Sequence, residues 1–517
     1  MSNMGVARVA SRAQLGLAAP RVEVEVHLGS GLPHFSIVGM PATAVKESKD
    51  RVRAALQNSG FDFPAGRITV NLSPADLPKE GCRYDLPIAL GILLASSQIR
   101  IPDALLDAEF YGELGLAGEL KPVKGVLLAA AHAARDARCV VVPAANVPEA
   151  RLAAREAVHG AATLLAVCDL SGVPRSADDA LPMQTMPTRR ADAADLADVR
   201  GQAAAKRALL IAAAGAHSLL LVGPPGTGKS MLAQRLPGLL PGLDDHEALD
   251  VASIASVSTR GFDPRQYGVR PFRAPHHSAS MGAIIGGGPQ ARPGEVSLAH
   301  RGVLFLDELP EFNRSVLESL REPLENGMVA VSRAARQLEY PARFQLIAAM
   351  NPCPCGYLGD PSGRCRCAPP EIARYRARIS GPLLDRIDLR VEVPNVPQEE
   401  LLDDLPAGAA VLTSAAAAAR VRAARALQLA RAGKLNTELT VPEIQRTCGL
   451  DRPCRALLAH ARVKLGLSAR GVHRVLRIAR TIADLRCADP ASAAAAHTAG
   501  SISPEHLAEA LQLRRAL

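Results

Sequence analysis

A glycine-rich stretch that contains one lysine and one serine is the clearest candidate for chemistry in this sequence. It reads Gly223, Pro224, Pro225, Gly226, Thr227, Gly228, Lys229, Ser230 and fits the pattern G-x-x-x-x-G-K-[ST]. Glycines let backbone N–H groups converge on phosphate oxygens, while the lysine reaches the β and γ phosphates and the serine ligates magnesium. We therefore predict a site for ATP and Mg²⁺, with an incidental glycine-rich turn as the alternative.

Two adjacent carboxylates, Asp307 and Glu308, end the apolar run VLFL. Because the carboxyl ends of parallel strands face the phosphate crevice, we expect Asp307 to hold the magnesium shell and Glu308 to polarise the attacking water. A charged strand end without function is the alternative. The phosphate loop upstream makes the catalytic interpretation the stronger one.

A polar amide, Asn351, ends a third apolar run, Phe344–Met350. An amide at this place suits a residue that senses the γ phosphate or orients the water. A side chain that only caps the strand is the alternative.

One arginine, Arg386, follows a predicted helix end in the stretch GPLLDRID. Such a cation can reach the phosphate of a neighbouring subunit, as an arginine finger does. An intrachain pair with Asp385 or Asp388 is equally compatible with the residues alone.

Four of the ten cysteines are confined to residues 353–367, as Cys353-Pro-Cys355 and Cys365-Arg-Cys367. Four soft ligands on a loop are enough for a tetrahedral structural Zn²⁺ site, which would brace the loop after Asn351. Free thiols or an iron–sulfur cluster are the alternatives. Disulfides are not expected in the reducing cytosol.

The composition indicates a globular protein of several domains. Hydrophobic residues make up 48% and charged residues 21% of 517 residues, a length that corresponds to roughly three domains. No apolar run approaches the roughly 20 residues that span a bilayer, and the first residues lack a signal-peptide pattern. We expect a cytoplasmic protein with no membrane contact.

The net charge of +9 is concentrated near the C-terminus, where residues 411–517 carry 17 Lys and Arg against 7 Asp and Glu. A local excess of this size is typical of a surface that contacts a polyanion such as DNA. A solvated helical face is the alternative.

The predicted elements place these residues in separate domains. Short strands alternate with helices over residues 1–170, which indicates an α+β or α/β domain, and the proline-rich residues 171–193 form a linker. Residues 194–396 contain the helix Gln202–Gly215 and the strand Ser218–Val222 before the phosphate loop, as in an α/β nucleotide-binding core. Residues 397–517 have helical spacing and form a predicted all-helical lid.

Six further stretches carry a family resemblance: DVRGQ from Asp198, RPFRAPHH from Arg270, PGEVSLAH from Pro293, DELPEF from Asp307, NPCPCG from Asn351, and Ser468 to Asp484. With them the sequence resembles the magnesium-chelatase-like AAA+ ATPases of the YifB/ComM competence-protein family over nearly its whole length. The resemblance implies that Asn351 is sensor 1, Arg386 the arginine finger and Arg470 the sensor 2 arginine. Arg474 and Arg477 follow Arg470 by one and two helical turns, so they compete for the last role.

The same resemblance implies a homohexamer with ATP sites between subunits. It also implies a DNA helicase that drives branch migration during recombination of DNA taken up in natural transformation. The stretch Val329–Pro341, with Arg333, Arg336 and Tyr340, resembles a hairpin that projects into the pore of related helicases. Basic residues there would grip phosphates without reading bases, so DNA binding should be sequence-independent and weakened by salt.

The N-terminal domain resembles the Lon protease catalytic domain without its chemistry. In Lon proteases a Lys-Asp-Gly-Pro-Ser stretch holds the nucleophile, whereas Lys79-Glu-Gly-Cys-Arg here places Arg83 at the serine position. Cys82 is an alternative nucleophile, but no motif places a base beside it.

Two other functions remain open from the sequence. One is a magnesium-chelatase-type motor subunit, although such relatives lack the long N-terminal domain and the four cysteines. The other is a protein-remodelling scaffold that ATP switches, against which Lys229 and Glu308 argue. His276 and His277 either contact DNA or a neighbouring subunit, or are packed loop histidines.

Overall fold

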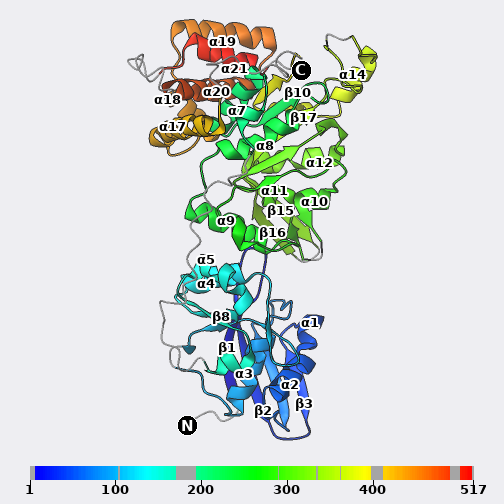
Figure 1. Cartoon of the computed structure of the whole chain (residues 1–517), viewed down its shortest axis with the longest axis vertical. Coiled ribbons are helices and arrows are strands. Elements are labelled where there is room, and N and C mark those ends of the chain that lie inside the picture. Colours follow the sequence, from blue (N-terminus) through cyan, green and yellow to red (C-terminus); the bar gives the residue numbers. More distant parts are fainter. Residues whose placement is uncertain are drawn as a thin grey trace. The chain divides into compact units, whose positions relative to one another are not determined.

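The computed structural model (Figure 1) describes residues 6–102, 105–169, 194–288, 290–333, 336–360, 363–397, 412–488 and 501–514. Contacts divide the chain into two compact units, one of residues 1–187 and 245–268 and one of residues 188–244 and 269–517. The predicted linker, residues 171–193, lies outside the described residues.

One segment departs from the predicted domain boundaries. Residues 245–268 were expected in the ATPase core, yet they belong to the first unit. There α9 (Asp245–Ser256) contacts α4 (Val126–Arg135) and buries Ala248, Ala252 and Ile254. The burial of this apolar face explains why the segment leaves the core to which its sequence neighbours belong.

The first unit is built on a mixed sheet with the strand order β3-β4-β2-β1-β5-β8-β9. Its strands are β1 (Val6–Arg12), β2 (Arg21–Gly29), β3 (His34–Val38), β4 (Arg67–Ser73), β5 (Glu109–Phe110), β8 (Val140–Pro143) and β9 (Val158–Ala161). Alternate residues of β2 are buried, as expected for a strand with one face on the core. Helix α3 (Asp85–Ala95) is almost wholly buried and packs on β1 and β2.

The second unit contains a parallel sheet with the order β11-β14-β17-β10-β18. Its strands are β11 (Phe272–Arg273), β14 (Val303–Leu306), β17 (Gln345–Met350), β10 (Leu219–Val222) and β18 (Leu389–Glu392). Every residue of β10, β14 and β17 is buried, which matches the continuous apolar runs typical of parallel strands. Since all five strands are parallel, the residues that follow them meet at one edge of the sheet.

The predicted hairpin is present as β15 (Met328–Arg333) and β16 (Arg336–Pro341), paired antiparallel. Tyr340 is buried, and its hydroxyl donates to the Ala291 carbonyl at 2.9 Å. It therefore anchors the base of the hairpin. Residues 334 and 335 lie outside the described part of the chain.

The C-terminal residues contribute helices to the second unit (orange to red in Figure 1). They are α17 (Ser414–Ala432), α18 (Val441–Thr447), α19 (Arg452–Leu465), α20 (Ala469–Cys487) and α21 (Pro504–Gln512). α20 and α17 pack on α7 (Ala203–Gly215), so these helices share a hydrophobic core with the sheet. Among the described helices, none combines the length and apolarity needed to cross a membrane.

Candidate nucleotide site and arginine cleft

The phosphate loop joins β10, which ends at Val222, to α8 (Lys229–Leu239). A side chain at Gly223 would place its Cβ 2.1 Å from the Val393 carbonyl oxygen, so only glycine fits there. Gly226 and Gly228 have φ of 81° and 86°, in the left-handed region that favours glycine. The strand, turn and helix therefore form in the predicted order.

Lys229 lies at the centre of the loop and is buried. Its Nζ donates to the carbonyls of Gly223 at 2.7 Å and Pro224 at 2.6 Å, and lies 3.3 Å from Asn351 Oδ1. Burial lowers the pKa of Lys229, although the nearby Asp307 carboxylate opposes this shift. Asn351 follows β17, so the structure brings this amide to the phosphate loop as the sequence predicts.

The two predicted magnesium ligands contact each other, because Ser230 Oγ donates to Asp307 Oδ2 at 2.7 Å. Glu308 follows with φ of 52°, an unusual conformation for a residue with a side chain. Its backbone N–H donates to Asp307 Oδ1 at 3.0 Å. Both acids therefore stand at the same sheet edge as Lys229.

His277 is the residue at this site whose role sequence reasoning left open. Its Nδ1 lies 3.2 Å from Glu308 Oε2, while the neighbouring His276 bonds Ser278 Oγ at 2.8 Å. β11 pairs with β14, so the loop after β11 passes beside the end of the Glu308 strand. The run RPFRAPHH places both histidines shortly after β11, but only the pairing of β11 with β14 brings them near the acids.

An ion pair fixes the start of that loop. Arg273 ends β11 and donates to both carboxylate oxygens of Glu295, at 2.5 and 2.7 Å. This bidentate pair joins two of the stretches on which the family resemblance rests. It therefore orients the segment that presents His277 to Glu308.

The ligand atoms of the four clustered cysteines all lie within 4.8 Å of one another. Cys353 Sγ is 3.3 Å from Cys355 Sγ and 3.7 Å from Cys365 Sγ. Zn–S bonds of about 2.3 Å in a tetrahedron require sulfur separations of about 3.8 Å, so the four thiols fit zinc. Backbone N–H groups of Tyr357 and Arg366 lower the pKa of the Cys355 thiol to about 6. Against a backbone hydrogen bond from Cys355, the Cys355 and Cys353 thiols raise the pKa of Cys367 to about 12, so Cys355 is the first of these two to become a thiolate.

The cysteine loop touches the phosphate loop. A Cβ at Gly356, next to Cys355, would lie 2.7 Å from Pro225 Cδ. The close approach shows that the cysteine loop supports the loop that holds Lys229.

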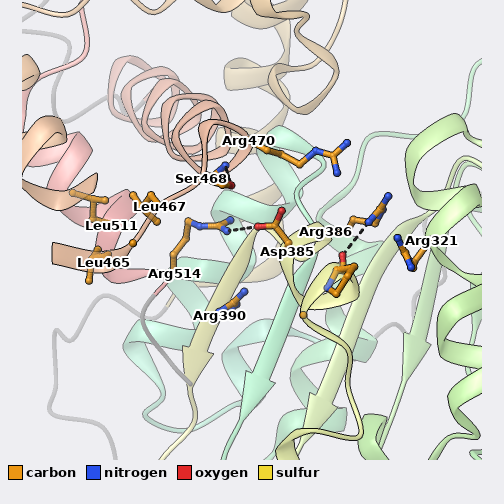
Figure 2. A pocket seen from close by; sticks show the side chains of 14 residues that line it. Arg321, Asp385, Arg386, Arg390, Leu465, Leu467, Ser468, Arg470, Leu511 and Arg514 are labelled. Atoms are coloured by element: carbon orange, nitrogen blue, oxygen red, sulfur yellow. Dashed lines mark hydrogen bonds and ion pairs between the residues drawn. The ribbon is translucent and has the colours of Figure 1, made fainter. Parts of the chain in front are cut away.

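Arg386 and Arg470 lie together in a separate cleft of about 780 Å³ (Figure 2). Its lining includes five arginines, which are Arg321, Arg386, Arg390, Arg470 and Arg514. Arg386 ends α15 (Gly381–Arg386) and Arg470 begins α20, and each donates to one carboxylate oxygen of Glu325, Arg470 at 2.6 Å. No residue of the phosphate loop is among the described residues that line this cleft.

The intrachain partner of Arg386 is therefore neither Asp385 nor Asp388. Asp388 accepts from Arg474 at 2.5 Å, and Asp385 lies 3.7 Å from Arg514. Charge–charge contacts with several arginines and a hydrogen bond from His217 overcome burial and lower the pKa of Asp388.

The three arginines of α20 that compete for the sensor 2 role differ in accessibility. Arg470 is 51% exposed, whereas Arg474 is 14% exposed and bonded to Asp388. Burial lowers the pKa of Arg477, which donates to the Leu439 carbonyl. Arg470 is thus the one of the three that lines the cleft.

Cys82 of the first unit is not activated as a nucleophile by its surroundings. Burial raises the pKa of the Cys82 thiol, which keeps it protonated at neutral pH. The guanidinium of Arg83 donates to Gln14 Oε1 and to the Lys124 carbonyl, both at 2.8 Å. Arg83 therefore has a structural contact where the resemblance places a serine nucleophile.

Three sequence families match successive parts of the chain. They are described as subunit ChlI of Mg-chelatase (residues 24–146), magnesium chelatase, subunit ChlI (residues 195–401), and magnesium chelatase, subunit ChlI C-terminal (residues 412–514). A magnesium-chelatase 67 kDa subunit of Heliobacterium mobile is 28% identical over 240 residues, or 41% of this chain and 34% of that protein.

Other relatives match from end to end. The competence protein ComM of Haemophilus influenzae is 48% identical over 520 residues, which cover 99% of this chain and 98% of ComM. The YifB protein of Salmonella typhimurium is 47% identical over 519 residues, covering 99% and 97% of the two chains. The chain therefore belongs to the YifB/ComM family of magnesium-chelatase-like AAA+ ATPases.

Proposed function

We propose that this chain is the subunit of a hexameric ATP-driven DNA motor, a helicase for branch migration in the recombination of DNA taken up in natural transformation. The observation that carries the motor is the convergence of Lys229, Ser230, Asp307 and Asn351 at one sheet edge. End-to-end similarity to the competence protein ComM supports the recombination role.

Each residue at the sheet edge has a defined task in this proposal. The backbone N–H groups of Gly226, Thr227 and Gly228 and the ammonium of Lys229 bind the triphosphate. Ser230 and Asp307 would hold Mg²⁺, which neutralises phosphate charge when bound. Glu308 takes the proton of the attacking water, and Asn351 senses the γ phosphate.

The arginine cleft supports a ring. Arg386 and Arg470 face a cleft lined by none of the described phosphate-loop residues, so they are suited to serve the nucleotide of a neighbouring subunit. Of the three candidates on α20, accessibility favours Arg470 as the sensor 2 arginine. We infer a homohexamer from this arrangement and from family membership.

DNA contacts are assigned to two basic regions. The first is the β15–β16 hairpin, and the second is the surface of α19, where Arg452, Arg455, Arg462 and Lys464 are exposed. Neither region groups basic with exposed aromatic side chains, so contacts should be to phosphates and independent of sequence.

The finer structural interpretations belong to this proposal too. We assign the first unit a Lon-protease-like, non-catalytic fold, the C-terminal helices the role of a lid, and the four cysteines a structural Zn²⁺. We place the protein in the cytoplasm.

The test compares the parent chain with Glu308→Gln, using ATP hydrolysis and unwinding of a branched duplex over a salt series. We expect branched DNA to stimulate the parent, and unwinding to fall steeply as salt rises. Glu308→Gln should bind ATP normally but hydrolyse it about 100-fold more slowly.

Other outcomes would support the other two functions. The matches to three magnesium-chelatase families favour a chelatase-type motor as the second candidate. Stimulation by a porphyrin-binding partner in place of DNA would support it. Absence of unwinding at every salt concentration would support an ATP-switched protein-remodelling scaffold.

A further inference from the structure

Glu325 is the shared partner of Arg386 and Arg470, two residues far apart in sequence. Arg386 bonds Oε2, and Arg470 bonds Oε1 at 2.6 Å. One carboxylate thus pairs with an arginine from α15 and with an arginine from the C-terminal helices. The pKa of Glu325 is lowered mainly by hydrogen bonding from Arg386 and also by the charge of Arg470. Glu325 is therefore ionised at neutral pH.

The two contacts differ in their exposure. The side chains of Glu325 and Arg470 are 45% and 51% exposed, and an ion pair open to water holds its partner weakly, whereas the side chain of Arg386 is 10% exposed. A triphosphate offers more negative charge and more acceptor oxygens than one carboxylate, so arginines exchange favourably from Glu325 to it.

Glu325 also lies at the root of the hairpin. It is in the last turn of α13 (Arg321–Asn326), and β15 begins at Met328 after the single residue Gly327. Gly327 has φ of 68°, so the chain reverses there without strain. α13 contacts both α15 and β15. A change at Glu325 therefore reaches the first residues of the hairpin directly.

The helix end supplies a physical reason for movement. A carboxylate in the last turn of a helix is repelled by the negative end of the helix dipole. Arg386 and Arg470 offset this repulsion while they remain bound to Glu325. When both arginines leave, nothing offsets the repulsion between Glu325 and the helix dipole, and the last turn of α13 becomes less stable.

We propose that Glu325 is a positioning residue that couples nucleotide binding in the neighbouring subunit to the β15–β16 hairpin. Without nucleotide it holds Arg386 and Arg470 and keeps the end of α13 ordered. When both arginines turn to the neighbour's triphosphate, the root of the hairpin is released. This inference rests on the proposed assignment of both arginines to the neighbour's nucleotide.

The test measures amide hydrogen exchange of Met328–Val331 in the full chain, with and without the slowly hydrolysed analogue ATPγS. The variant is Glu325→Gln, and the matched control is Glu322→Gln, an exposed carboxylate on the same helix. In the parent and the control, ATPγS should raise exchange at least about threefold. In Glu325→Gln the charge that the helix dipole repels is absent, so exchange should be low without nucleotide and should not respond to it.

A Glu325→Gln chain that responds to ATPγS as the control does would overturn the inference. If exchange rises throughout the variant, including β10, the substitution has unfolded the chain. Glu325→Asp, which keeps the charge, then replaces Glu325→Gln in the test, and we expect an intermediate response to ATPγS. Because exchange needs no DNA, a parent that shows the nucleotide response but unwinds nothing would contradict the helicase proposal alone.

Discussion

The two sheets of this chain use charge in opposite ways. In the first unit, Glu109 is fully buried and accepts from Arg12 at 2.7 and 2.8 Å and from Tyr111 at 2.6 Å. In the second unit, Lys229 and Asp307 lie at the open ends of parallel strands. Charged groups whose hydrogen-bond partners all lie inside the fold stabilise it. Charged groups gathered at strand ends beside a glycine loop can exchange their partners for a ligand.

The largest effect should come from the open site. Replacing Lys229 by Ala removes the ammonium from the phosphate loop, so we expect ATP hydrolysis to fall about 100- to 1000-fold. The free energy of unfolding of the first unit should not change. A steady-state ATPase assay measures the loss, with Lys46→Ala, an exposed lysine of the first unit, as the control. Equal rates in parent and Lys229→Ala would refute the motor interpretation.

The buried cluster of Glu109, Arg12 and Tyr111 should show the reverse pattern, a loss of stability and not of ATP hydrolysis. Glu109→Gln takes away the buried carboxylate of Arg12 and leaves it only Asp136, which is 55% exposed, and this should lower the free energy of unfolding by about 3 kcal/mol. The matched control is Asp107→Asn, since Asp107 pairs with Arg138 at 3.5 Å but is 92% exposed. Urea unfolding of the two variants measures the difference. If the control loses as much stability as Glu109→Gln, burial is not what makes the cluster important.

His300 tests whether the second unit also contains a buried, hydrogen-bonded polar group that stabilises the fold. It is buried, accepts from the Arg343 N–H at 3.1 Å, and burial lowers its pKa from 6.5 to about 3. Between these values the unfolded chain binds the extra proton, so stability falls as pH falls. We expect its contribution between pH 7 and pH 5 to be a loss of about 2 kcal/mol.

The measurement is urea unfolding at both pH values. His300→Gln keeps a hydrogen-bond acceptor but does not titrate, so it should lose less stability at pH 5 than the parent does. An unchanged pH dependence in His300→Gln would assign the loss to other groups.

The smallest effect should come from His277, which orients Glu308 without touching the phosphate loop. We expect His277→Ala to lower kcat about tenfold, because a misplaced base transfers the proton less efficiently, while KM stays unchanged. His276→Ala removes a stacked neighbour, with ring centroids 4.1 Å apart, that does not contact Glu308. Both variants losing activity equally would mean that the loop as a whole matters, and not the contact with Glu308.

Local patterns made much of the second unit predictable. The phosphate loop, the acidic strand end and the cysteine cluster are each short runs whose residue types determine their chemistry. Strands β10, β14 and β17 follow from continuous apolar runs that only a sheet covered on both faces can bury. The sequence therefore sufficed to identify Lys229, Asp307 and Asn351 as neighbours.

Contacts between distant segments were not predictable in this way. Glu325 is 61 residues from Arg386 and 145 from Arg470, and many other carboxylates had equal claim to either arginine. The position of His277 depends on the pairing of the two-residue strand β11 with β14. Such a strand is too short for periodicity to reveal.

The return of residues 245–268 to the first unit has a consequence for how the chain can be divided. The backbone passes between the units at three places, near residues 187, 244 and 268. A cut near residue 187 would separate α9 from α4 and leave the apolar side chains of Ala248, Ala252 and Ile254 uncovered in the remaining fragment. Neither unit can therefore be cut out as one continuous segment. A fragment meant to isolate the ATPase must also replace residues 245–268 with a short loop.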